Sequence, residues 1–194
     1  MGCIYPKRGA RPVLFREAMS SVLLRDAVAA DDAAIGEMLV EAFVLSYAQK
    51  LPDVVVTDRR KVELRDVASK RAAAKVWVAE LAGVVVGTVS MWPPGSPRTE
   101  AWISDAADLR HLAVSATQRG RGVSKVLLDQ AEAWGRAMGF AGVCLHVRRE
   151  ATGVGRIYVA RGYERRPEGD LDLLPEVFLE AYFLPFGRSW SLLT

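Results

Sequence analysis

Apolar residues recur along this chain at two spacings, and the spacings predict where helices and strands form. Apolar positions three and four residues apart predict a first helix that begins at Asp31 or Asp32. Its buried face consists of Ile35, Met38, Leu39, Ala42 and Phe43. Further helices are predicted over about 57–74, over 123–138 with Gly139 as the end signal, and over about 152–160. Short apolar runs between turn residues predict strands over 22–25, 76–81, 84–91, 109–114, 141–147 and 177–184, with another sheet segment beginning at Gly162.

The order of these elements predicts the class of fold. A strand, two helices, three strands, a helix, a strand, a helix and two more strands predict an α/β domain with a mixed, mostly antiparallel sheet flanked by helices. One strand–helix–strand crossover falls in the second half. Residues 22–194 are expected to form this single domain, because 51% of the 194 residues are hydrophobic and supply a sizeable core. Residues 1–21 carry no periodic apolar pattern and are expected to be a basic, poorly ordered tail.

Charge and cysteine content exclude several classes of function. The net charge is +3, and residues 1–20 alone account for it with four basic residues against Glu17. The remaining chain is formally neutral, which argues against a nucleic-acid-binding surface. Two cysteines, Cys3 and Cys144, match neither a disulfide framework nor a zinc site, so we expect no metal centre and a cytoplasmic location. The sequence lacks an apolar run of roughly 18 residues, so no membrane span is predicted.

A glycine-rich turn is the most informative segment of the sequence. The predicted strand ending in Leu112-Ala113-Val114 leads to the run Arg119-Gly120-Arg121-Gly122-Val123-Ser124, where a helix begins. The first amide N–H groups of a helix have no partner within it, and the helix dipole adds partial positive charge at that end. With two arginines beside it, the turn predicts a site for a phosphorylated ligand.

Two common phosphate-binding motifs do not fit this turn. A P-loop requires lysine directly before serine or threonine, whereas Lys125 follows Ser124. The dinucleotide fingerprint requires a third glycine where Lys125 stands, and it follows the first strand of a parallel unit.

The turn and its context resemble the GNAT superfamily of acyl-CoA-dependent N-acyltransferases. That family carries R/Q-x-x-G-x-G/A after a strand that often reads L-x-V, and this chain departs from the pattern with Ser124 at the last position. The resemblance covers about residues 22–186 and implies the family's fold, with acetyl-CoA as co-substrate. The implied cofactor-binding residues are Leu112, Ala113, Val114, Arg119, Gly120, Arg121, Gly122, Val123 and Ser124.

A second segment supports the same resemblance. Residues 145–148 are followed by Ile157-Tyr158 and by Gly162-Tyr163, which is similar to the family's L-E-V-R…L-Y-x-x-x-G-F/Y segment. Relatives commonly carry asparagine where this chain has Ala151, so one contact to the pantetheine arm or the adjacent chain is missing from the pattern.

The resemblance also implies the chemistry: direct attack of an amine on the thioester, with no acyl-enzyme. Tyr158 matches the general acid of the family, and a backbone N–H of the 112–114 strand would meet the oxyanion. Three candidates for the general base stay open: Asp108, His146, and water acting together with backbone groups. His111 ranks lower, because strand alternation would place it on the face opposite Asp108 if the strand already runs there. Cys144 is interpreted as a core thiol.

The acceptor is not encoded in a recognisable motif. Glu168, Asp170, Asp172 and Glu176 could attract a cationic amine or could form a solvated loop, and Trp92 and Trp102 could line an acceptor pocket or the core. A small amine and a protein amine both stay open, as does pairing of the last strand into a homodimer. The alternative function is a non-catalytic acyl-CoA sensor, which the retention of Tyr158 disfavours and the loss of asparagine at Ala151 favours.

Overall fold

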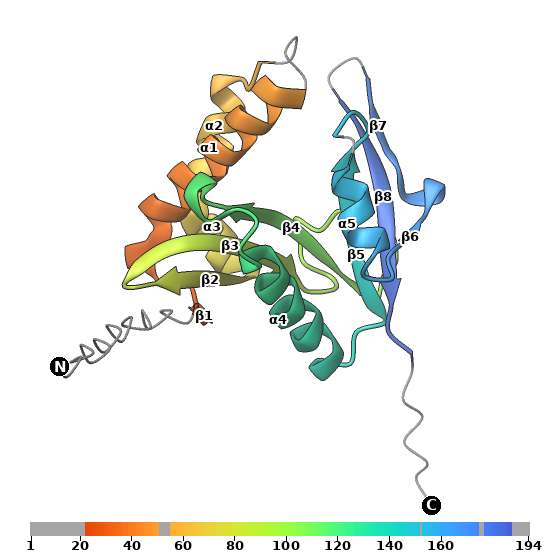
Figure 1. Cartoon of the computed structure of the whole chain (residues 1–194). Coiled ribbons are helices and arrows are strands. Elements are labelled where there is room, and N and C mark those ends of the chain that lie inside the picture. The colour runs from red at the N-terminus through yellow and green to blue at the C-terminus, as the bar shows by residue number, and fades with distance from the viewer. Residues whose placement is uncertain (1–21, 51–54, 152, 175–176, 188–194) are drawn as a thin grey trace, which may run out of the picture.

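The computed structural model describes residues 22–50, 55–151, 153–174 and 177–187. The predicted tail over residues 1–21 and the acidic residue Glu176 lie outside this part. Eight strands form one sheet: β1 (Leu23–Asp26), β2 (Lys75–Leu81), β3 (Val84–Trp92), β4 (Ala106–Val114), β5 (Gly142–Arg148), β6 (Glu164–Arg165), β7 (Leu171–Leu173) and β8 (Val177–Pro185). Their order is β1-β2-β3-β4-β5-β8-β6, and β7 also pairs with β8 (Figure 1). All pairs are antiparallel except β4 with β5, so the predicted mixed, mostly antiparallel sheet is confirmed.

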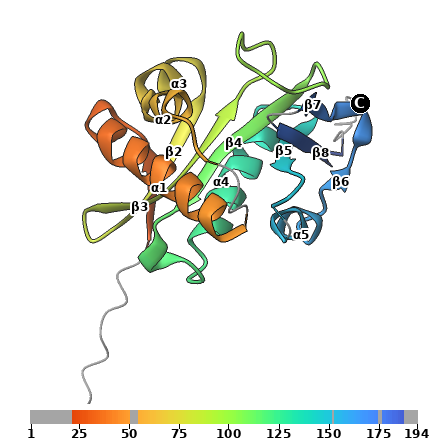
Figure 2. The ribbon, with the colours of Figure 1, turned by 90° about the horizontal axis from the view of Figure 1, so that it is seen from above.

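Helices cover both faces of this sheet. They are α1 (Asp32–Lys50), α2 (Asp58–Arg65), α3 (Val67–Ala73), α4 (Val123–Ala137) and α5 (Val154–Val159). Short 3-10 turns add η1 (Ala29–Asp31), η2 (Ala116–Gln118) and η3 (Pro167–Gly169). Alternation along β2 divides the core: Val76 and Val78 pack with α1 and α3, whereas Trp77 packs with α4 on the other face. Figure 2 shows α3 and α4 on opposite sides of the sheet.

Two predicted boundaries are wrong, for identifiable physical reasons. The helix predicted over 57–74 is two helices, because Asp66 leaves helical geometry with ψ 67° and its carboxylate accepts the Ser69 N–H as the cap of α3. The Lys70 ammonium donates to the carbonyls that end α2, which stabilises the break. The strand predicted from Leu109 begins at Ala106, where alanines hide the strand pattern but pair with Gly142 and its neighbours on β5.

β4 carries one extra residue, a bulge, at the point where it separates from β5. Thr88 and Ser90 of β3 face Ala113 and Arg110 of β4, so β4 spans the same length with one residue more. His111 takes a left-handed conformation there, with φ +56°, which is the geometry of a β-bulge. Pairing between β4 and β5 ends at Leu109 with Leu145, and Figure 1 shows the two strands diverging beyond that point.

Candidate functional site

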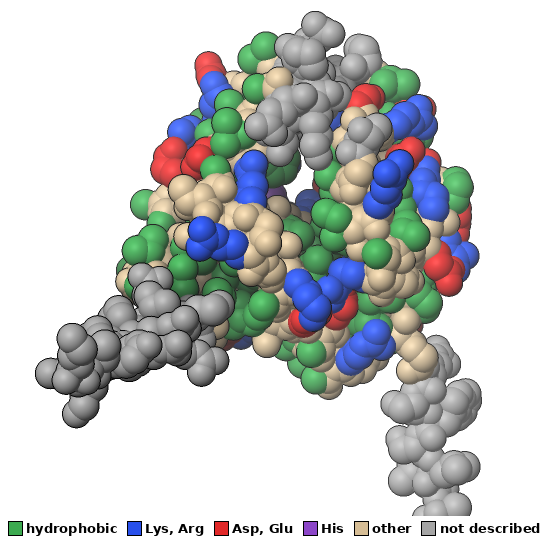
Figure 3. All heavy atoms as spheres, in the orientation of Figure 1, with side chains coloured by type: hydrophobic (Ala, Val, Ile, Leu, Met, Phe, Trp, Pro, Cys, Tyr) green, Lys and Arg blue, Asp and Glu red, His purple; other side chains and the backbone are tan. Residues whose placement is uncertain are grey.

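The divergence of β4 and β5 opens a cleft in the middle of the sheet. Figure 3 shows a hollow on this face, between the part of the molecule built on α1 and α2 and the part built on α5 and β8. The cleft therefore has β4 as one wall and β5 as the other. The catalytic candidates named from the sequence lie on these two strands or on α5, the helix that follows β5.

The glycine turn between β4 and α4 presents unpartnered backbone donors. Gly120 and Gly122 have φ of +74° and +82°, and no described atom lies within 4 Å of the Cβ that another residue would carry. Val126 donates to the Gly122 carbonyl, whereas the amides of residues 119–125 donate no backbone hydrogen bond within the described ranges. Neither Arg119 nor Arg121 pairs with a described carboxylate. The turn is thus open, donor-rich and basic, as an anion site requires.

The end of β4 offers an unpaired strand edge beside this turn. Ala113 and Val114 pair with Thr88 and Gly87 of β3 on one side. On the other side β5 has already diverged, so the 110–114 edge has no strand partner among the described residues. An extended ligand arm can complete such an edge with hydrogen bonds.

Tyr158 lies on α5 with its ring against Tyr163, at a centroid distance of 5.4 Å. It is 7% exposed, and burial raises the pKa of its phenol to about 12, with Arg161 lowering and Glu132 raising it. The phenol therefore stays protonated over the whole physiological range. Arg161 binds Glu132 at 2.8 Å and Asp129 at 2.7 Å, which fastens α5 to α4.

Asp108 is fully buried in β4, and one of its carboxylate oxygens already accepts hydrogen bonds from neighbouring groups. Its Oδ2 accepts hydrogen bonds from the Arg110 guanidinium at 2.6 Å and from the Glu100 amide at 2.8 Å. Its Oδ1 is buried without a partner in the described part of the chain. The carboxylate thus holds Arg110 and the 93–105 loop in place.

His111 lies closer to this group than strand alternation predicts. The strand does run through Asp108, but the bulge cancels the alternation, and the His111 ring packs on Trp92 at 5.4 Å, as does the Arg110 guanidinium at 5.0 Å. Burial lowers the pKa of His111 well below its usual value, and the positive charges of Lys70, Arg60 and Arg110 lower it further. His111 is therefore a neutral imidazole at physiological pH.

His146 lies on β5, one residue beyond the last pair with β4. Its Nε2 is 2.9 Å from the Gly169 carbonyl oxygen of η3, and its ring meets the Trp102 indole edge-on at 5.5 Å. Leu145 and Val147 pack in the cluster that contains Tyr158, whereas Cys144 packs in the cluster of Trp102. His146 and Tyr158 therefore lie on opposite faces of β5.

Three other sequence predictions have clear outcomes. Cys144 is a core residue, and burial raises the pKa of its thiol to about 12, so it is no thiolate nucleophile at neutral pH. Asp170 is bound to Arg165 at 2.6 Å and to the Ala181 amide, so within the acidic stretch it is a structural residue. Trp92 is a core residue whose ring packs against His111 and Arg110.

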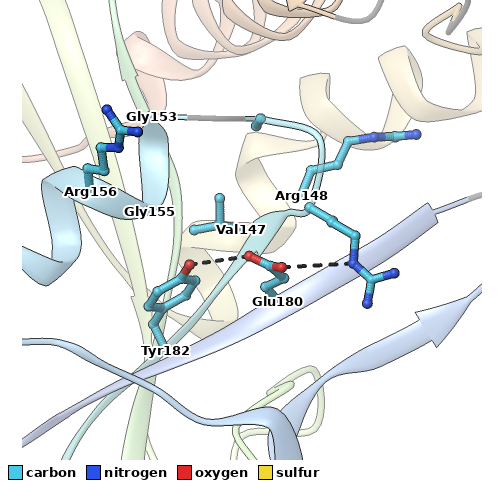
Figure 4. Close-up of a pocket in the computed structure, with 9 residues that line it drawn as sticks. Val147, Arg148, Gly153, Gly155, Arg156, Glu180 and Tyr182 are labelled. Atoms are coloured by element: carbon cyan, nitrogen blue, oxygen red, sulfur yellow. Dashed lines mark hydrogen bonds and ion pairs between the residues drawn. The ribbon is translucent and has the colours of Figure 1, made fainter.

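A separate pocket of about 240 Å³ lies beneath the first turn of α5 (Figure 4). Ala151 lines it, at the position where the family pattern has asparagine. The Tyr182 hydroxyl donates to Glu180 at 3.2 Å, and Glu180 also pairs with Arg149 at 3.8 Å. A Cβ at position 155 would lie 2.6 Å from the Tyr182 hydroxyl oxygen, so the Tyr182 side chain would have to shift if another residue replaced Gly155. None of residues 119–124 lines this pocket, so it is distinct from the glycine turn.

A sheet split between two parallel strands, with a donor-rich turn beside the split, defines an α/β protein that can hold a phosphorylated ligand between β4 and β5. The family model of the acetyltransferase (GNAT) family matches residues 34–163. The chain therefore belongs to the GNAT family.

Individual relatives agree with this assignment. The chain is 31% identical to rat N-acetyltransferase 8 over 116 residues, which are 58% of this chain and 51% of that protein. The chain thus spans about half the length of the curated relatives that it matches. Among solved structures, it resembles a GNAT acetyltransferase from Staphylococcus aureus Mu50, with TM-score 0.63, 16% identity and coverage of 85% and 99% of the two chains. It also resembles the PaiA N-acetyltransferase of Thermoplasma acidophilum in complex with coenzyme A, with TM-score 0.61, 16% identity and coverage of 83% and 98%.

Two further features are absent from the described residues. No helix in those ranges is both long enough and apolar enough to cross a bilayer. No group of three or more histidine, cysteine, aspartate or glutamate side chains in the same ranges is arranged to hold a metal ion.

Proposed function

We propose that this chain transfers an acetyl group from acetyl-CoA to a primary amine by direct attack within a ternary complex. The glycine turn carries this proposal, because its amides donate no backbone hydrogen bond within the described ranges and its two arginines pair with no carboxylate there, so the turn matches the charge of a pyrophosphate. Its position at the start of α4 lets a ligand bound there run along the open edge of β4. The cofactor-binding set is then Arg119 to Ser124 with Leu112, Ala113 and Val114.

Tyr158 serves the departing thiolate in this proposal. A thiol has a pKa of about 8.5 in an unperturbed side chain, and the pKa of the Tyr158 phenol is about 12. Full proton transfer from the phenol to the thiolate is therefore unfavourable, but a hydrogen bond from the phenol stabilises the thiolate as the C–S bond breaks. An amine that arrives as an ammonium gives up two protons: the first passes to a base before the attack, and the second, released as the amide forms, neutralises the sulfur.

His146 is the proposed acceptor of the amine proton. It faces the side of β5 opposite Tyr158, so an amine and a thioester that meet in the cleft would lie between the two residues. The unprotonated nitrogen of a neutral imidazole can accept a proton. Asp108 is a weaker candidate, because Arg110 and the Glu100 amide already occupy one of its oxygens.

The proposal is tested by thiol release from acetyl-CoA with a panel of small amines, lysine peptides and peptide N-termini, together with calorimetry of CoA binding. Amine-dependent thiol release with a matching acetylated product would support it. Tight CoA binding without thiol release for any amine would instead favour a non-catalytic acyl-CoA sensor. The observation that supports this alternative is Ala151, which stands where the family pattern has asparagine. The cytoplasmic location, the nature of the amine and a homodimer stay predictions.

A further inference from the structure

Three groups from distant parts of the chain meet on the face of β5 opposite Tyr158. His146 comes from β5, Trp102 from the loop between β3 and β4, and Gly169 from η3. Gly169 contributes its backbone to both contacts: its carbonyl faces the imidazole, and its Cα faces the indole. The three residues thus pack against one another on this face of the sheet.

The contact to Gly169 fixes which nitrogen of His146 carries a proton. A carbonyl oxygen only accepts hydrogen bonds, so Nε2, at 2.9 Å from it, must be the donor. Nε2 keeps its proton in the neutral ring and in the imidazolium alike. The Nδ1 atom is then the position that gains and loses a proton, and it is buried without a partner among the described residues.

The contact to Trp102 fixes where the Gly169 carbonyl lies. A Cβ on Gly169 would meet the indole atoms Cδ2, Cε2 and Cε3 within 2.6 Å, so only glycine lets the backbone lie against the ring. The same indole meets the His146 ring edge-on. The Trp102 indole therefore fixes both the position of the Gly169 carbonyl and the orientation of the His146 ring.

We infer that Trp102 and Gly169 are positioning residues that hold His146 as its Nε2–H tautomer, with Nδ1 as the proton-accepting atom. The inference rests on the proposed function, since the proton at Nδ1 is the one that the attacking amine gives up. Neither residue touches the reacting atoms. A hydrogen bond to the second nitrogen of a catalytic histidine commonly sets its tautomer and orientation in this way.

The test is the ¹⁵N spectrum of the imidazoles in the free protein, with turnover measured separately. The sequence contains two histidines, so His146→Gln assigns both sets of signals. In the wild type we expect His146 to show a protonated Nε2 and an unprotonated Nδ1. In Gly169→Ala we expect the tautomers to mix, and the kcat to fall about 10²-fold, the scale of a misplacement of about 1 Å, while the KM for acetyl-CoA stays within about twofold.

Gly187→Ala is the matched control, because nothing lies within 4 Å of its new Cβ. It should leave both the tautomer and the kcat unchanged. Trp102→Leu removes the ring that a Cβ at position 169 would meet, so Gly169→Ala should cost much less in that background than alone. If Gly169→Ala alone does not fold, the comparison of Trp102→Leu with the double variant provides the test instead.

An Nδ1–H tautomer in the wild type, or an unchanged tautomer in Gly169→Ala and in Trp102→Leu, would overturn the inference. The spectrum needs no substrate, so its result is independent of the proposed function. A chain that turns over no amine but shows the fixed tautomer and loses it in Gly169→Ala would contradict the enzyme and support the positioning.

Discussion

Arg161 at the end of α5 binds Glu132 of α4 with both contacting nitrogens at 2.8 Å. The pair is mostly buried, with side-chain exposures of 16% and 13%, and together with the Arg161–Asp129 pair it links α5 to α4. Tyr158 lies one helical turn before Arg161, and the Arg161 amide donates to its carbonyl. The position of the phenol is thus coupled to α4 through this ion pair.

Arg161→Met should destabilise the domain, because it leaves Glu132 with an uncompensated charge in a mostly buried place. We expect a loss of about 2 kcal/mol, which lowers the Tm by about 4–8 °C in a domain of this size. Lys125→Met is the control, since its pair with Asp129 is exposed and should contribute less than about 0.5 kcal/mol. Equal melting points for the two variants would contradict this account of the link.

Gly122→Val should weaken CoA binding at least about tenfold, because a branched side chain is strained at φ +82° and stands where the phosphates must approach the backbone. Calorimetry of CoA binding measures the effect. Gly83→Val carries the same backbone strain, at φ +78° in the hairpin between β2 and β3, and lies far from the turn in sequence. Both variants should lose similar stability, but Gly83→Val should bind CoA as the wild type does. Unchanged affinity in Gly122→Val would remove the turn from the binding site.

Tyr158→Phe keeps the ring and its contact with Tyr163 and removes only the donor. We expect the kcat to fall about 10²- to 10³-fold, with acetyl-CoA affinity within a few fold. The phenol acts only while protonated, and its pKa is about 12, so the wild-type rate should show no alkaline decline from this group below about pH 11. In Tyr163→Phe, which loses a hydroxyl bound to Glu132 at 3.4 Å, turnover should stay within about threefold. Full turnover by Tyr158→Phe would show that another group serves the thiolate.

His146→Gln and Asp108→Asn separate the two candidate bases. If His146 accepts the proton, His146→Gln should lower the kcat about 10²-fold or more. Asp108→Asn should mainly destabilise the fold by about 2 kcal/mol, because the Arg110 guanidinium loses its buried partner. The reverse pattern, with catalysis lost in Asp108→Asn and kept in His146→Gln, would assign the base to β4.

The sequence predicted the sheet type, the glycine turn and most of the element order, because each depends on residues that are near one another in the chain. It merged α2 and α3 into one helix and missed β7. Residues 119–124 can be recognised as a glycine-rich turn before a helix within a few positions of sequence. The contact among Trp102, His146 and Gly169 could not be predicted, because no local pattern links three positions so far apart. The bulge at His111 leaves no trace in the residue types either, since neither glycine nor asparagine marks it. Without the bulge, counting along the strand placed His111 on the wrong side of the sheet.

The two halves of the sheet are joined by few hydrogen bonds. In the described ranges the backbone seam between them runs from Asp105 with Ala141 to Leu109 with Leu145, and beyond it the strands separate. Hydrogen exchange at these amides would report how often the two halves separate along this seam. A ligand that pairs with β4 and also touches α5 would bridge the halves beyond the seam. Its binding should therefore slow exchange along the seam as well as at its own contacts, so such a ligand would stiffen the sheet that binds it.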